Sequence, residues 1–196
     1  MKKIISLVCS IALLLSVAAC GNVKDDSVKA EPTPTPMVDE NLITVDITLP
    51  AKYFEDKTED EIMQEAAEDE YYQTAKVNDD GSVTYTMTKA NYKAMMKEFA
   101  EGLDKTFSEY VGNEEVGLGY IQDVKHSKDF TEVNYTVDPD AYDSQSWIAA
   151  HVTIAYCAYY QALSNVPEDD IHVVVNFLDM NTGDVVETFD TNDLGE

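Results

Sequence analysis

The sequence contains no arginine. All 13 basic residues are lysines, against 38 aspartates and glutamates, so the formal net charge is −25. Arginine supplies the planar guanidinium groups that usually bind phosphate, and a negatively charged surface repels nucleic acid and anionic lipid headgroups. We therefore expect no nucleic-acid partner. Cationic peptides, polyamines or divalent metals would be attracted, although an acidic coat that keeps a domain soluble is the commoner reason for such a composition.

Cysteine is also scarce, with three residues in the whole chain. Cys9 lies within an N-terminal apolar run, and Cys20 directly follows this run. Cys157 is the one cysteine in the rest of the chain, after residue 20. We expect no intrachain disulfide, and a domain of this size can rely on its hydrophobic core instead. Because Cys157 lies in the most apolar segment of the domain, we expect it to be buried rather than reactive.

The N-terminus lacks a hydrophobic run long enough to span a membrane. Lys2 and Lys3 precede an apolar run of about 14 residues, whereas a membrane-spanning helix needs about 20. This pattern is typical of a secretory signal peptide. Residues 17–20, Val-Ala-Ala-Cys, resemble the lipobox of bacterial lipoproteins, in which a diacylglycerol is attached to the cysteine sulfur before cleavage. The alternative is an ordinary signal peptide in which Cys20 is incidental.

These features divide the chain into three parts. Residues 1–19 are the expected signal peptide, and residues 20–40 are a lipidated cysteine followed by a proline- and threonine-rich tether. In an extended polyproline conformation, such a tether can place a domain up to roughly 60 Å from its anchor. Residues 41–196 are the expected single globular domain, since the 44% hydrophobic content is enough for a packed core. The expected location is the extracellular face of the cytoplasmic membrane, with the lipid on Cys20 as the membrane contact.

Periodic patterns predict the elements of this domain. Strict alternation of apolar and polar residues predicts strands, and apolar residues at steps of three and four predict helices. The strands are expected at residues 42–49, before and after a turn at 77–83, at 121–126, 130–137, 173–178 and 185–189, and the helices at 58–71, 89–111 and 138–163. The order of a strand followed by three helix-plus-hairpin units predicts an α+β fold, with a mostly antiparallel sheet of about seven strands and three helices packed on one face.

Three segments together resemble one group of proteins. They are residues 43–50, residues 79–88, and residues 174–177 with the later Asn181-Thr-Gly183. They look like a group of uncharacterised Gram-positive, clostridia-type lipoproteins, and the resemblance covers nearly the whole mature chain. It implies a lipidated, tethered protein and brings no activity or site residues.

The candidates for metal binding have simpler explanations. His126, His151 and His172 lie on three separate predicted elements with no close spacing such as H-x-x-x-H. Residues 179–184 partly imitate a calcium loop, but glycine falls at position five and aspartate at position six, where the EF-hand pattern needs a ligand and a glycine. A hairpin turn explains this segment better. We expect no metal and no cofactor.

No catalytic residue is predicted. The sequence has none of the common nucleophile, zinc-protease or nucleotide-binding motifs, and paired carboxylates are common by chance in a chain with 38 acids. One group of aromatic residues can line a ligand groove, since sugar rings and partner proteins often stack on such side chains, although helical spacing more often indicates a core. The group consists of Trp147, Tyr156, Tyr159 and Tyr160.

The sequence therefore predicts a non-enzymatic cell-surface lipoprotein that binds an unidentified surface protein or small ligand. One alternative is a wall-associated hydrolase that uses carboxylates, which a motif search would miss. Another is weak binding of divalent cations by the acidic surface.

Overall fold

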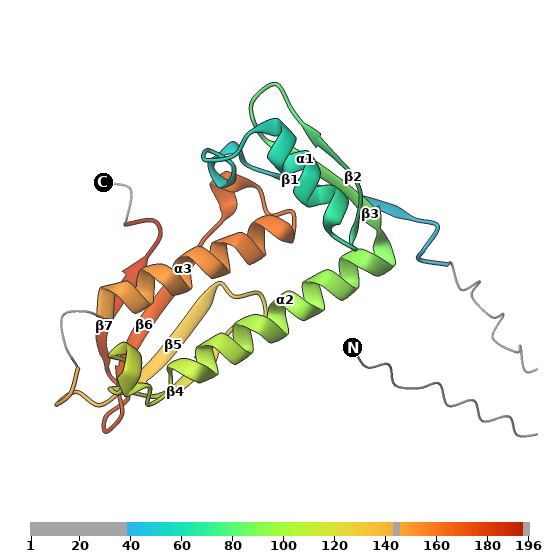
Figure 1. Cartoon of the computed structure of the whole chain (residues 1–196). Helices are drawn as coiled ribbons and strands as arrows, with labels where there is room; N and C mark the ends of the chain where they lie inside the picture. The colour runs from blue at the N-terminus through green and yellow to red at the C-terminus, as the bar shows by residue number, and fades with distance from the viewer. Residues whose placement is uncertain (1–38, 143–145, 194–196) are drawn as a thin grey trace, which may run out of the picture. The chain divides into compact units, whose positions relative to one another are not determined.

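The structure, a computed structural model, describes residues 39–142 and 146–193 (Figure 1). Within these ranges it contains three α-helices and seven strands in two mostly antiparallel sheets, which confirms the predicted α+β class. The predicted signal peptide, Cys20 and nearly all of the tether lie outside the described residues. None of the helices in the described ranges is both long and apolar enough to cross a membrane.

The N-terminal sheet is antiparallel and has three strands in the order β1-β3-β2. They are β1 Thr44–Leu49, β2 Tyr72–Val77 and β3 Val83–Thr88. The predicted alternation is confirmed: Ile47 and Leu49 are buried, and they pair with Tyr85 and Val83 of β3. The intervening polar residues contact one another on the other face, where the hydroxyls of Thr48 and Thr84 are 2.9 Å apart.

The C-terminal sheet has four strands in the order β4-β5-β6-β7. They are β4 Ile121–His126, β5 Glu132–Val137, β6 Val174–Asp179 and β7 Val185–Asp190. Neighbouring strands are antiparallel except β5 and β6, which run parallel because helix α3 crosses between them. The strands therefore form two sheets, where we expected one. Alternation identifies a strand from its own residues, but it does not identify the strand with which it pairs.

Three α-helices connect and cover these sheets. They are α1 Glu59–Glu68, α2 Lys89–Tyr110 and α3 Ser146–Leu163, and three short 3-10 helices lie at Ala51–Tyr53, Glu114–Val116 and Glu168–Asp170. α1 begins with a capping box, since the Thr58 side chain accepts from the Glu61 N–H and the Glu61 side chain accepts from the Thr58 N–H. α2 begins with a similar cap, in which the Thr88 hydroxyl accepts from the backbone N–H of Asn91.

The predicted start of the third helix at residues 138–139 is wrong. Residues 139–141 form a turn, in which the backbone N–H of Tyr142 donates to the carbonyl of Asp138 at 2.9 Å. The Asp138 side chain also accepts the N–H of Asp140, so the residue expected to cap a helix caps this turn instead. The Tyr142 ring then packs against Phe177, with 5.4 Å between the ring centroids.

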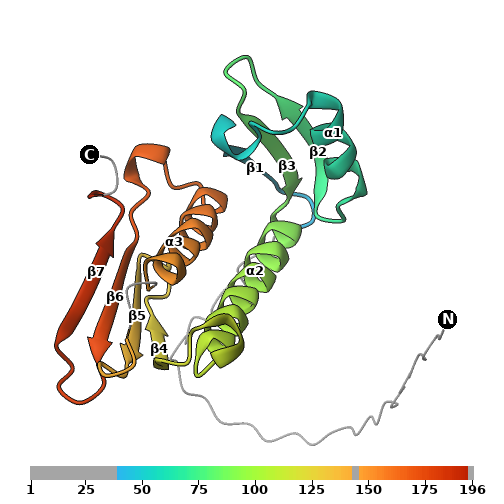
Figure 2. The same cartoon turned by 60° about the vertical axis from the view of Figure 1, so that its left-hand side comes forward.

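The buried side chains form two clusters, and α3 contributes to both. Ile154 and Cys157 belong to the cluster that covers the C-terminal sheet, while Ala162 and Leu163 belong to the cluster that covers the N-terminal sheet. Figure 2 shows α2 and α3 on the same side of the C-terminal sheet. The predicted burial of Cys157 is confirmed, and this burial raises the pKa of its thiol to about 12.

One face of α3 is more exposed than its composition suggested. A helix that is apolar nearly all round is normally buried on more than one side, and α3 does contact both sheets. Nevertheless four of its large apolar side chains are between 38% and 51% exposed, namely Trp147, Ile148, Val152 and Tyr156. The buried side of the helix carries the smaller residues that let it approach the C-terminal sheet, among them Ala149 and Ala150.

Candidate functional site

A cleft of about 480 Å³ lies between α2 and α3. Its size is within the range of small-molecule sites, about 300–1,000 Å³. The segment that joins α1 to β2 completes the lining. The lining residues are Asp69, Tyr71, Tyr72, Met95, Glu98, Phe99, Gly102, Leu103, Thr106, Tyr156, Tyr159 and Leu163. We refer to this site as the α2–α3 cleft.

Apolar and aromatic side chains form the inner part of the α2–α3 cleft. Met95, Leu103 and Leu163 are buried, and they come from facing helices. The rings of Phe99 and Tyr159 pack against each other with their centroids 5.7 Å apart. Residues three or four apart share one face of a helix, so Met95, Phe99 and Leu103 together form the apolar part of the α2 wall.

Two carboxylates lie at the exposed rim, and Tyr71 contacts both. The backbone N–H of Tyr71 donates to Oδ1 of Asp69 at 2.7 Å, and its phenol donates to the carboxylate of Glu98. Asn91 of α2 holds this segment in place by donating from its side-chain amide to the carbonyl of Tyr71 at 2.9 Å. The segment before β2 is therefore fixed to α2 by side-chain hydrogen bonds at the edge of the cleft.

The two rim carboxylates have no lysine partner among the residues that the structure describes. The lysines of α2 pair with other acids: Lys93 with Glu40, Lys97 with Glu101, and Lys105 with Glu109. Of the residues that line the cleft, none is basic. The cleft therefore carries negative charge that no described side chain neutralises.

Three phenols of the lining, those of Tyr71, Tyr72 and Tyr159, have raised pKa values and stay protonated at physiological pH. The hydrogen bond to Glu98 raises the pKa of Tyr71 to about 12. Burial is the main cause that raises the pKa values of Tyr72 and Tyr159 above the ordinary value for tyrosine. The lining thus combines aromatic rings with two carboxylates.

Gly102 lies in the middle of α2 and lines the cleft. Glycine in a helix interior is roughly 0.5–1 kcal/mol less favourable than alanine. No close contact requires it here, since a Cβ at this position would meet no atom within 4 Å. What the glycine does provide is open space at the cleft wall, which a larger side chain would fill.

The structure brings together two of the four aromatic residues that the sequence singled out. Tyr156 and Tyr159 both line the α2–α3 cleft. Trp147 lies near the start of α3 and meets the His151 ring edge-on at 5.7 Å. Tyr160 does not line the cleft: its ring packs against Phe130 with the centroids 4.7 Å apart, and against the lining residue Phe99 with the centroids 6.2 Å apart. Trp147 and Tyr160 therefore do not belong to this site.

Sequence reasoning missed the residues that the α1–β2 segment contributes. Asp69, Tyr71 and Tyr72 lie far along the chain from α3, and only the packing of the domain brings them to the cleft. Glu98 did not stand out in the sequence, because the chain has 38 aspartates and glutamates. The one local signal was Gly102, because a glycine interrupts an otherwise regular amphipathic helix there.

The three histidines occupy separate places and each has a polar partner. His126 Nε2 is 2.7 Å from the Asp104 carboxylate, and His151 Nδ1 is 2.7 Å from the Trp147 carbonyl. His172 Nε2 is 2.8 Å from the carboxylate of Asp190. Across residues 39–142 and 146–193, no three metal-ligating side chains gather into a group that can hold an ion.

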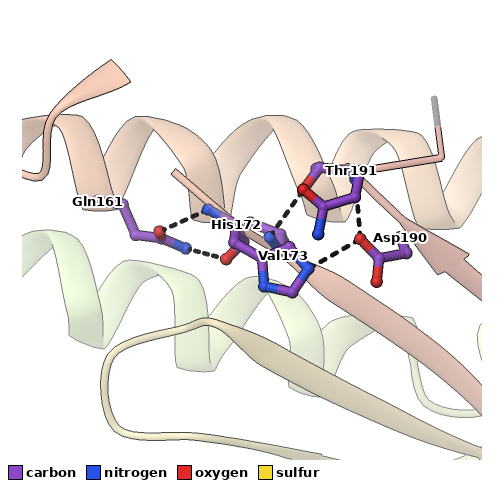
Figure 3. A network of polar contacts seen from close by, with 6 residues as sticks. Gln161, His172, Val173, Asp190 and Thr191 are labelled. Atoms are coloured by element: carbon purple, nitrogen blue, oxygen red, sulfur yellow. Dashed lines mark hydrogen bonds and ion pairs between the residues drawn. The ribbon is translucent and has the colours of Figure 1, made fainter. Parts of the chain in front are cut away.

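The contact between His172 and Asp190 belongs to a polar network (Figure 3). The Gln161 side chain donates to the His172 carbonyl at 2.8 Å and accepts its N–H at 3.2 Å. The N–H of Val173 donates to the Thr191 hydroxyl at 3.1 Å. The network joins the end of α3 to the start of β6 and the end of β7, so its role is to satisfy buried and half-buried backbone groups.

The segment that partly imitates a calcium loop is a hairpin turn, as predicted. Its polar groups bind the turn's own backbone: Asp179 accepts the N–H of Asn181, and the Thr182 hydroxyl accepts the N–H of Asp184. Gly183 has a positive φ of 76°, as glycine in such a turn often does.

No protein-family model, curated protein or solved structure matches the chain. What the α2–α3 cleft can bind is therefore argued from the residues that line it. Its aromatic walls, apolar floor and acidic rim can hold and orient a small molecule.

Proposed function

We propose that the chain is a lipoprotein held at the extracellular face of the cytoplasmic membrane through Cys20, and that its domain binds a small ligand in the α2–α3 cleft. Residues 17–20 support the anchor, because they place a cysteine where the lipobox pattern has one. The observation that carries the binding site is the cleft itself, at about 480 Å³ with Gly102 in its wall.

Binding accounts for the cleft better than catalysis does. Its described lining includes no histidine, cysteine, serine or lysine, so it lacks the common nucleophile–base pairs such as Ser–His and Cys–His. Both rim carboxylates accept hydrogen bonds from Tyr71, which gives them a role in holding the α1–β2 segment. We therefore favour a non-enzymatic binding protein.

A wall-associated hydrolase is the second candidate. The observation that favours it is that Asp69 and Glu98 line one cleft together with aromatic rings, because glycosidases use two carboxylates and sugars stack on such rings. A hydrolase of this kind would release product from wall glycan, and Glu98→Gln would abolish that release. If the wild-type protein releases no product, this candidate is ruled out.

The proposed binding site can be tested by a substitution that fills the cleft. We expect Gly102→Leu to fill the cleft and to abolish the NMR shifts that bound fragments cause in cleft residues, while the melting temperature stays the same or rises. The matched control is Glu101→Leu, which adds the same side chain at the neighbouring exposed position outside the lining. Fragments that bind wild type and Gly102→Leu equally well would contradict the proposed site.

A further inference from the structure

We propose that the ligand of the α2–α3 cleft is a small organic cation, with an ammonium group that carries apolar substituents. This inference rests on the proposed binding function and adds the chemical class of the ligand. It follows from the charge of the rim, from the aromatic walls and from the number of carboxylates available.

The charge of the rim selects for a cation. Asp69 and Glu98 are exposed, both line the cleft, and neither forms an ion pair with a described residue. The nearest lysines along α2, Lys93 and Lys97, are engaged by Glu40 and Glu101. An anionic ligand would meet two carboxylates and no compensating charge, so repulsion would oppose its binding.

The aromatic walls suit an ammonium group. The rings of Tyr72, Phe99, Tyr156 and Tyr159 line the cleft, and the face of an aromatic ring attracts a cation. The buried floor of Met95, Leu103 and Leu163 offers apolar surface to alkyl substituents. A sugar would need polar partners for several hydroxyl groups, and this floor provides none.

A bare metal ion fits the site poorly. Calcium takes six to eight oxygen ligands and magnesium six, whereas the cleft presents two carboxylates beside apolar side chains. No cluster of three potential metal ligands is found in the described residues. An organic cation can contact the aromatic rings and the apolar floor as well as the two carboxylates. It therefore interacts with more of the lining than a metal ion does.

The test compares choline with its uncharged isostere, in which a tert-butyl group replaces the trimethylammonium group. Binding to the full processed chain in detergent is followed by NMR at residues of the cleft. We expect choline to shift these residues and the isostere to bind about tenfold more weakly or worse. We expect Asp69→Asn with Glu98→Gln to weaken choline binding by about tenfold and to leave the isostere unaffected.

Two further variants separate the possible results. Asp184→Asn with Asp193→Asn removes the same charge outside the lining and should leave choline binding intact. If this control weakens choline binding as much as the cleft variant does, general surface charge is the cause and the inference is wrong. Tyr156→Leu, at an exposed position that tolerates substitution, should weaken choline more than the isostere.

The remaining outcomes distinguish this inference from the proposed function. If the isostere binds in the cleft as tightly as choline, the ligand is not selected by charge, and cleft binding itself stands. If neither probe shifts a cleft residue, the organic-cation inference is overturned, and the Gly102→Leu fragment comparison decides separately whether the cleft binds any small molecule.

Discussion

At the scale of single residues, a buried hydroxyl pair is the feature most sensitive to substitution. The hydroxyls of Tyr135 and Thr153 are 2.8 Å apart, and both residues have no exposed surface. Burial raises the pKa of Tyr135 well above its ordinary value, so the phenol stays protonated. The pair ties α3 to the middle of the C-terminal sheet by a hydrogen bond within the hydrophobic cluster.

Removing both hydroxyls of this pair should cost less than the sum of the two single removals. We expect Thr153→Val and Tyr135→Phe each to lower the free energy of unfolding by about 1–3 kcal/mol, because each leaves a buried hydroxyl without its partner. The double variant should lose less than the sum of the two. Urea denaturation of all four proteins measures this, and strictly additive losses would contradict it.

At the scale of elements, local patterns account for most helices and strands. The strand in residues 42–49, the helix that begins near Thr58 and the turn before Val83 each depend on neighbouring residues, and each was predicted correctly. The division into two sheets depends on pairing between distant strands, which no local pattern encodes. The error at Asp138 has a physical cause, because an aspartate followed by proline begins a turn as readily as a helix.

The candidate site was predictable only in part, for the same reason. Tyr156 and Tyr159 were found because they belong to one aromatic stretch of α3. Tyr71 and Glu98 reach the cleft from two other elements, and the hydrogen bond between them is a product of tertiary packing. The polar contact that shapes the rim therefore has no sequence signature.

The capping box of α1 should make this helix sensitive to acid. Hydrogen bonds from the Thr58 backbone and side chain, both 2.8 Å, lower the pKa of Glu61 below the ordinary value for glutamate. A lowered pKa means that the stabilisation is present above about pH 4.3 and is lost as the pH falls through the folded-state pKa. The protection of α1 amides against hydrogen exchange, measured relative to the intrinsic rate at each pH, should therefore decrease in this range.

Two variants isolate the contribution of the capping box. Glu61→Gln should speed amide exchange of α1 at pH 6 and remove this part of the acid dependence. Glu59→Gln removes a charge from the same helical turn without breaking the box, and should leave the acid dependence in place. Identical pH profiles for wild type and Glu61→Gln would refute this explanation.

The glycine of α2 should limit the stability of the helix. We expect Gly102→Ala to raise the free energy of unfolding by about 0.5–1 kcal/mol, since a Cβ meets no neighbour there and alanine is the better helix former. Ala94→Gly, at an exposed position of the same helix, should lower it by a similar amount. Thermal denaturation measures both, and a loss of stability in Gly102→Ala would argue against the open environment of this residue.

At the scale of the whole molecule, the proposed membrane anchor depends on one sulfur atom. We expect mass spectrometry of the processed protein to find a chain that begins at Cys20 with a diacylglycerol attached, and Cys20→Ala to abolish this modification and release protein from the membrane fraction. Cys9→Ala, within the apolar run, is the matched control and should change neither result. An unmodified residue 20 in wild type, or an uncleaved leader in the cytosol, would refute the anchor.

The position of α3 has a further consequence for how the domain melts. Because α3 supplies side chains to both hydrophobic clusters, separating the two sheets would expose both ends of α3 to water at once. Calorimetry should therefore record one cooperative endotherm, and two resolved peaks would contradict this. A compound held against α3 would raise the melting temperature of the entire domain by mass action, so occupancy can be measured without a coloured or fluorescent ligand.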